Sequence, residues 1–72
     1  MTPEEIRDRF SYHVPSLAGV ERHKALTSTF SATAATVDDA CPDSREKSLA
    51  MTKLEEAKFW ASAAVARNTA TR

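Results

Sequence analysis

Apolar side chains recur at helical spacing over two long stretches of the chain, and the first of these stretches has a narrow apolar face. Its apolar positions repeat every three or four residues, which is the period of one side of an α-helix. They are Leu26, Phe30, Ala34, Val37 and Cys41. The other positions are rich in Thr and Ser, which are mediocre helix formers, so packing must stabilise this segment. We predict a helix over residues 18–40.

The second stretch, residues 44–68, has a much wider apolar face. At about 100° per residue its apolar positions fill roughly half of the helix circumference, and one partner helix needs only ~100°. These positions are Leu49, Ala50, Met51, Leu54, Ala57, Trp60, Ala61, Ala64 and Val65. We assign Trp60 and its neighbour Phe59 to the hairpin core and to contacts between subunits. Apolar surface is left over, which predicts self-association.

Polar and proline residues predict where the first helices begin and end. Thr2 followed by Pro3 is typical of a helix start, which predicts a short helix over residues 3–10. Because the residue before a proline avoids helical backbone, Pro15 predicts an extended link over residues 11–17. Ser16 can cap the helix that follows.

The stretch "CPDSREKSLA" predicts a tight turn between the two long helices. Pro42 ends the first helix, Asp43 is a good N-cap residue, and Glu46 completes a capping box. Two long helices joined by so short a turn must fold back on each other. The predicted fold is therefore all-α: one domain over residues 1–72, with a short N-terminal helix followed by an antiparallel two-helix hairpin. A chain this small gains only about 3–5 kcal/mol from its own core, so we expect a compact homo-oligomer.

Composition narrows the possible functions. Ten basic and ten acidic residues cancel, which argues against a general nucleic-acid binder but allows a small anionic ligand. The N-terminus has no apolar segment typical of a signal peptide, and the run "FWASAAVA" is far shorter than a membrane span, so we expect a soluble protein. One cysteine and two histidines lack the spacing of a zinc site. No nucleophilic constellation or glycine-rich phosphate loop is present, so we expect neither an enzyme nor a cofactor.

An aromatic cluster lies in the stretch "RDRFSYHVP". Tyr12 can stack on a ligand base or pack over the hairpin, and the residues alone leave both open. Next to it, His13 can donate to a phosphate or fix the link by bonding to the backbone. Phe10 is expected to anchor the short helix on the core.

Three segments of the chain carry a family resemblance. "RFSYHVP", "ERHKAL" and "CPDSREKSLAMTKLEEAKFWASAAVARN" resemble the Acb2/Tad1 hairpin-domain family of phage proteins. The resemblance implies small helical hairpins that assemble into compact hexamers and act in the cytoplasm of the infected bacterial host. It also implies an anti-CBASS sponge, which sequesters cyclic dinucleotides such as cGAMP, and cyclic trinucleotides, without cleaving them.

The resemblance further implies which residues bind each ligand. For a cyclic dinucleotide it implies base stacking by Tyr12, with His13 beside it, and a phosphate contact from Lys24 or Arg22. Thr27 stands at a position that is often basic in the family. The resemblance also implies a separate site for a cyclic trinucleotide, and from the residues themselves the candidates for it are Arg67, Asn68 and Ser28. Arg67 and Asn68 can equally cap the last helix, and the hydroxyl of Ser28 can simply belong to a polar helix surface.

A second function fits the same pattern of apolar residues. An oligomeric helical hairpin that binds a host protein, and no nucleotide, would also need an apolar face that its own helices leave uncovered. An exposed Tyr12 beside basic residues favours the nucleotide-binding function, because a scaffold has no use for it. Binding of duplex nucleic acid is opposed by the zero net charge.

Overall fold

Three helices make up the regular structure of the chain. The computed structural model describes residues 1–12 and 14–69, with α1 over Pro3–Phe10, α2 over Leu17–Ala40 and α3 over Arg45–Thr69. The all-α class predicted from the sequence is confirmed. Helix α2 begins one residue earlier than predicted, and α3 begins and ends one residue later. His13 lies outside the described residues.

The first two helix starts use the predicted capping residues. The Thr2 Oγ1 atom accepts a hydrogen bond of 3.1 Å from the backbone N–H of Glu5. The Ser16 Oγ atom likewise accepts one of 3.0 Å from the N–H of Gly19. Each side chain satisfies a donor that the first helical turn leaves without a partner. Both capping predictions are confirmed.

The predicted cap of the third helix is wrong. The Ser44 Oγ atom, and not the Asp43 carboxylate, accepts a hydrogen bond of 3.1 Å from the backbone N–H of Lys47. The Asp43 carboxylate instead binds the Lys47 ammonium group at 2.9 Å. Because α3 begins at Arg45, Ser44 occupies the N-cap position and Asp43 lies one residue before it.

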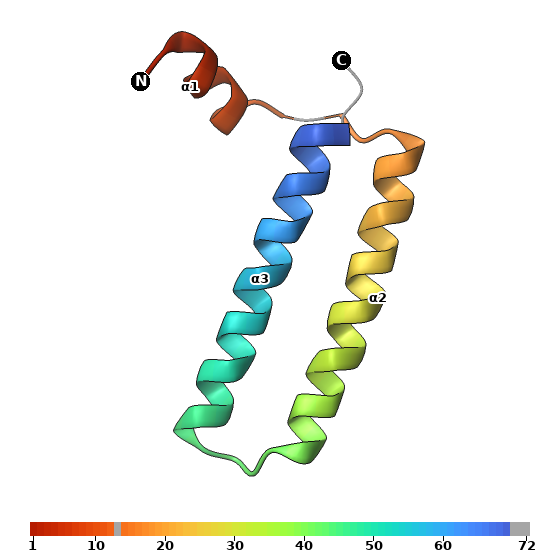
Figure 1. Cartoon of the computed structure of the whole chain (residues 1–72), viewed down its shortest axis with the longest axis vertical. Coiled ribbons are helices and arrows are strands. Elements are labelled where there is room, and N and C mark those ends of the chain that lie inside the picture. The colour runs from red at the N-terminus through yellow and green to blue at the C-terminus, as the bar shows by residue number, and fades with distance from the viewer. Residues whose placement is uncertain (13, 70–72) are drawn as a thin grey trace.

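Helices α2 and α3 lie side by side and antiparallel, joined by the turn at residues 41–44 (Figure 1). The short α1 lies beyond the C-terminal end of α3, on the side away from α2 (Figure 1). The molecule extends over 46 × 30 × 12 Å. Since one helix with its side chains is about 10–12 Å across, the hairpin is a single layer of helices.

The two long helices meet along one apolar seam. All five residues of the predicted apolar row on α2 are half-buried there, from Leu26 to Cys41. The half-buried apolar residues of α3 include Met51, Leu54, Ala61 and Val65. No hydrophobic side chain of the described residues is fully buried. The hairpin therefore has a seam but no enclosed core.

The chain exposes far more surface than a compact protein of its size. Its accessible area is 5698 Å², whereas a folded monomer of this mass has about 4,400 Å². Its radius of gyration is 15.5 Å, against about 11 Å for a compact chain of this length. A single layer of two helices accounts for the difference, because each helix has one covered side only.

Three predicted core residues are exposed. Phe10 is 78% exposed, so the prediction that it anchors α1 on the core is wrong. Trp60 and Phe59 are 66% and 63% exposed, so their assignment to the hairpin core is also wrong. The physical reason is that α2 covers only one side of α3, and these two side chains lie on other sides. Their assignment to subunit contacts stays a prediction.

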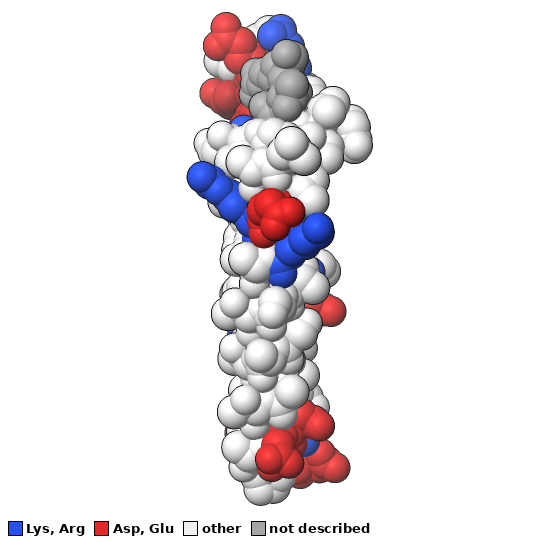
Figure 2. Space-filling view, turned by 90° about the vertical axis from the view of Figure 1, so that its right-hand side faces the viewer, with Lys and Arg blue, Asp and Glu red and all other residues white. Residues whose placement is uncertain are grey.

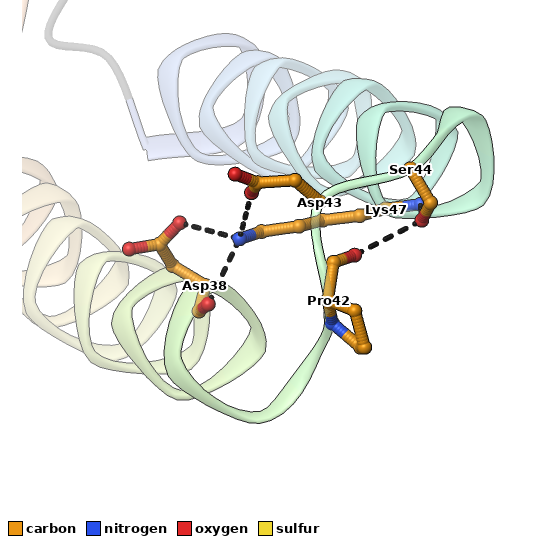
Figure 3. A network of polar contacts seen from close by, with 5 residues as sticks. All are labelled: Asp38, Pro42, Asp43, Ser44 and Lys47. Atoms are coloured by element: carbon orange, nitrogen blue, oxygen red, sulfur yellow. Dashed lines mark hydrogen bonds and ion pairs between the residues drawn. The ribbon is translucent and has the colours of Figure 1, made fainter.

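A lysine fastens the turn of the hairpin (Figure 3). The Lys47 ammonium group lies 2.9 Å from the Asp38 carboxylate, 2.9 Å from the Asp38 carbonyl oxygen and 2.9 Å from the Asp43 carboxylate. Only 12% of its side chain is exposed. The hydrogen bonds that its ammonium group donates to the Asp38 and then the Asp43 side chain raise the pKa of Lys47 above its ordinary value of 10.5. The lysine thus joins the end of α2, the turn and the first turn of α3.

The two long helices approach each other closely at the open end of the hairpin. Gly19 is buried there, and a Cβ atom added to it would lie 2.8 Å from the Thr69 Oγ1 atom. This contact is shorter than van der Waals distance, so the first turn of α2 can meet the last turn of α3 only because residue 19 is glycine.

None of the described helices is long and apolar enough to cross a membrane.

Candidate ligand-binding site

A hollow of about 510 Å³ lies on the N-terminal half of α2. It is lined by Pro15, Val20, His23, Lys24, Thr27 and Ser28. Five of these residues come from α2, at spacings that place them on one side of the helix. The volume falls within the range of roughly 300–1,000 Å³ that is typical of sites for small ligands.

The residues of the hollow combine one cation with hydroxyl groups and an apolar wall. Lys24 pairs with Glu21 at 3.6 Å, but both side chains are more than 70% exposed, at 71% and 73%. Such a surface pair contributes little, so the ammonium group can exchange Glu21 for a ligand anion at small cost. Val20 and Pro15 supply the apolar wall.

The two hydroxyl groups of the hollow differ from those farther along α2. The Thr33 and Thr36 hydroxyls donate to backbone carbonyls one turn back, at 2.9 Å and 3.1 Å. Within the part of the chain that the structure describes, Thr27 and Ser28 make no hydrogen bond through their side chains. Their hydroxyl groups are therefore available to a ligand.

The surface beside the hollow is uncharged over a long distance. From Ala25 to Val37 the sequence contains no charged residue. Figure 2 shows this stretch as a white surface with basic and acidic residues near one end and acidic residues at the other. An anionic ligand on this face would therefore find its cation at the N-terminal end of α2.

The structure brings three of the predicted site residues together, namely Lys24, Thr27 and Ser28. Arg22 does not line the hollow. It precedes Lys24 by two positions, which is a rotation of about 200° around the helix, so it points away from Lys24. Tyr12 lies in the link before α2 and is 83% exposed, but it is not part of the hollow. His13, the other predicted neighbour of the ligand, lies outside the described residues.

The residues predicted for a cyclic trinucleotide are separated within one chain. Arg67 and Asn68 lie in the last turn of α3, where the Asn68 side-chain amide donates to the Ala64 carbonyl at 2.7 Å. That turn lies beside Gly19, and Ser28 follows Gly19 by nine residues, which is about 13 Å along a helix. One chain thus groups Ser28 with Lys24 and not with Arg67.

Three residues of the hollow were not predicted from the sequence, namely Pro15, Val20 and His23. A signal for two of them was present: Val20 precedes Lys24 by four residues, and His23 precedes Thr27 by four. Residues four apart lie next to each other on a helix, so both could have been found from the predicted ligand residues.

A second hollow lies on the seam between α2 and α3, with a volume of about 340 Å³. It is lined by Phe30, Ser31, Ala34, Met51, Thr52, Leu54, Glu55 and Lys58. One acid and one base line it, so it offers an anion less than the first hollow does. Among residues 1–12 and 14–69 no group of three or more metal-binding side chains comes together.

Comparison with known proteins returned one family. A family model described as "Acb2/Tad1, hairpin domain" matches residues 2–66 of the chain. The match covers α1, the hollow and all but the last residues of α3. Neither a search of curated proteins nor a search of solved structures returned a match.

Proposed function

We propose, since this chain belongs to the Acb2/Tad1 hairpin-domain family, that it is a phage anti-defence protein that binds cyclic oligonucleotide second messengers. Binding holds the messengers away from the CBASS effectors that they would activate. Such a sponge acts by mass action, so no bond is made or broken. It would act where the messenger is made, in the cytoplasm of the infected bacterium.

The observation that carries this proposal is the grouping of Lys24, Thr27 and Ser28 around one hollow. A cyclic dinucleotide has two anionic phosphates and two flat bases. In the proposed complex the Lys24 ammonium group binds one phosphate, and the two hydroxyls donate to phosphate oxygens. The wall formed by Val20 and Pro15 contacts the sugar or the base.

Base stacking is assigned to Tyr12. Tyr12 as a whole is 83% exposed in the link that leads into α2, so a ligand can reach it. Stacking of one base on an aromatic side chain contributes about 1–3 kcal/mol. The Tyr12 ring and the hollow would then contact different parts of the same ligand.

The hollow is open, which favours a site completed by a second copy of the chain. The uncovered apolar surface of the hairpin supports self-association, and the family resemblance favours a hexamer. A cyclic trinucleotide site with Arg67, Asn68 and Ser28 would need these residues from neighbouring copies, because one chain separates them.

Isothermal titration with 3′,3′-cGAMP tests the proposal. We expect binding by the unmodified protein, strong loss in Tyr12→Ala and Lys24→Ala, and little change in two matched controls, Phe10→Ala and Arg45→Ala. Phe10 is another exposed aromatic residue, and Arg45 is an exposed cation at the far end of the hairpin. The bound ligand is then released and analysed.

The outcomes of this titration distinguish a sponge from an enzyme and from a protein that binds no nucleotide. Intact messenger recovered from the complex supports a sponge, and linear product would overturn the proposal in favour of an enzyme. Absence of binding to 3′,3′-cGAMP and to a cyclic trinucleotide would also overturn it. The exposed Phe59 and Trp60 would then favour the second function, a hairpin module that binds a host protein without nucleotide.

A further inference from the structure

Helix α3 carries an exposed strip on a side that α2 does not cover. The strip is centred on Ala57; it also contains the exposed residues Glu46, Leu49, Lys53, Trp60 and Ala64, and it ends at the half-buried Arg67. Successive members are three or four residues apart, so they follow one side of the helix. Trp60 is 66% and Leu49 is 49% exposed, whereas the seam residues of α3 are half-buried.

The strip is complementary to itself when it is read backwards. Residues at equal distance from a point between Glu56 and Ala57 form three pairs: Glu46 with Arg67, Leu49 with Ala64, and Lys53 with Trp60. The first pair joins opposite charges, and the second sets a large side chain against a small one. The third sets an ammonium group against an indole ring, which is a favourable cation–π combination.

We propose that a second copy of this chain covers the strip, with the two α3 helices antiparallel and the twofold axis between residues 56 and 57. A twofold interface uses the same surface on both copies, so each of the three pairs forms twice. The strip extends from Glu46 to Arg67, which is about 32 Å along a helix. Ala57 at the axis allows the helices to approach closely.

The charges of the strip determine the direction of pairing. Within residues 1–12 and 14–69 neither Glu46 nor Arg67 makes an ion pair. Lys53 pairs with Glu56 at 3.5 Å, but these side chains are 76% and 53% exposed, so that pair is weak. A parallel arrangement would bring Glu46 against the same glutamate of the second copy. Of the two arrangements, only the antiparallel one gives each of the three charges of the strip, Glu46, Lys53 and Arg67, an opposite charge or an aromatic ring.

This inference rests on the proposed self-association and not on nucleotide binding. It gives Arg67 a structural use, a contact with Glu46 of a second copy, which competes with its assignment to a trinucleotide. All tests are therefore made without nucleotide, so that a change in assembly cannot come from a change in ligand binding.

Disulfide trapping tests the position of the axis. In a Cys41→Ser background, Ala57→Cys places two thiols next to the proposed axis, whereas Ser48→Cys places an exposed thiol on another side of α3. A disulfide needs Cα atoms within about 7 Å. We expect a covalent dimer of the Ala57→Cys protein on a denaturing gel and none of the Ser48→Cys protein. Equal trapping at both positions, or trapping at residue 48 alone, would overturn the proposal.

Sedimentation equilibrium tests the pairs themselves. We expect Trp60→Ala to weaken association at least about 30-fold, the effect of losing a central interface residue, while Phe59→Ala leaves it nearly unchanged. The two neighbouring residues are equally exposed, but only Trp60 belongs to the strip. A larger effect from Phe59→Ala would place the interface on another side of α3 and refute the strip.

A charge reversal separates the pairing of the ends from simple loss of folding. Glu46→Arg alone and Arg67→Glu alone should each weaken association, and the protein with both changes should recover it. Circular dichroism at each concentration verifies that the variants are helical. A double variant no better than either single one would refute the pair. Association that persists in every variant would refute the strip but leave self-association standing, and a monomer at all concentrations would refute both.

Discussion

The close approach of α2 and α3 at the open end of the hairpin makes a quantitative prediction about Gly19. In Gly19→Ala, the new methyl group would lie 2.8 Å from the Thr69 Oγ1 atom, which is too close for an unstrained contact. The Thr69 side chain is not free to turn away, because its hydroxyl donates to the Val65 carbonyl at 2.6 Å. The helix ends must therefore move apart.

Two opposing effects set the size of the change. Overpacking of this kind costs about 1–3 kcal/mol. Alanine in a helix is favoured over glycine by up to about 1 kcal/mol, which offsets part of that cost. We expect Gly19→Ala to lower the free energy of unfolding by about 1 kcal/mol. In a Thr69→Ala background the clash is absent, so the same substitution should raise it by as much as about 1 kcal/mol.

A double-mutant cycle measured by urea unfolding isolates this contact. The added methyl group would also lie 3.2 Å from the Ser16 Oγ atom, but that contact is the same in both backgrounds and cancels. All four proteins are compared at one concentration, because self-association adds to the apparent stability. Equal effects of Gly19→Ala with Thr69 and with alanine at position 69 would show that the helices do not meet as described.

Three further predictions concern the turn and the seam. The pKa of the Lys47 ammonium group is raised, so its contribution to folding stability is fully present below pH 10.5 and is lost as the pH rises through the higher pKa of the folded state. The urea midpoint of the unmodified protein should therefore fall in that pH range, and the midpoint of Lys47→Met should fall less. Ser44→Ala should lower the free energy of unfolding by about 1 kcal/mol through loss of the N-cap. Asp43→Ala should lower it less in the same urea experiment, because the Asp43 carboxylate is 99% exposed; a larger loss from Asp43→Ala would indicate that Asp43 is the cap after all. At one fixed protein concentration, Phe30→Ala should lower the free energy of unfolding by about 2 kcal/mol because Phe30 lies in the seam, whereas Phe59→Ala should be close to neutral. Equal losses in thermal unfolding would contradict the seam.

The seam and two of the three caps could be predicted because each depends on residues close together in the sequence. The row from Leu26 to Cys41 repeats with the helical period, and every member of it is half-buried. The cap of α3 could not be predicted in the same way, because Asp43 and Ser44 are both good N-cap residues. The choice between them depends on Lys47, which also binds Asp38 across the turn.

The candidate site was predictable to the same limited degree. Lys24, Thr27 and Ser28 share a side of α2, so the helical period brings them together. The extended link that carries Tyr12 has no such period, so the sequence does not predict how far Tyr12 lies from the hollow. Periodicity also cannot tell an apolar face covered by α2 from one left for another molecule, which is why Trp60 was expected in the hairpin core.

The absence of any enclosed apolar side chain in the hairpin has a consequence for how the protein behaves when it is scarce. A chain without an interior depends on neighbours for much of its buried surface, so dilution removes its stability together with its contacts. We therefore expect no fixed melting temperature but one that rises with protein concentration. Below the concentration at which copies meet, the open chain would be an easy substrate for proteases. The amount of protein present, as much as its sequence, would then decide whether it is folded.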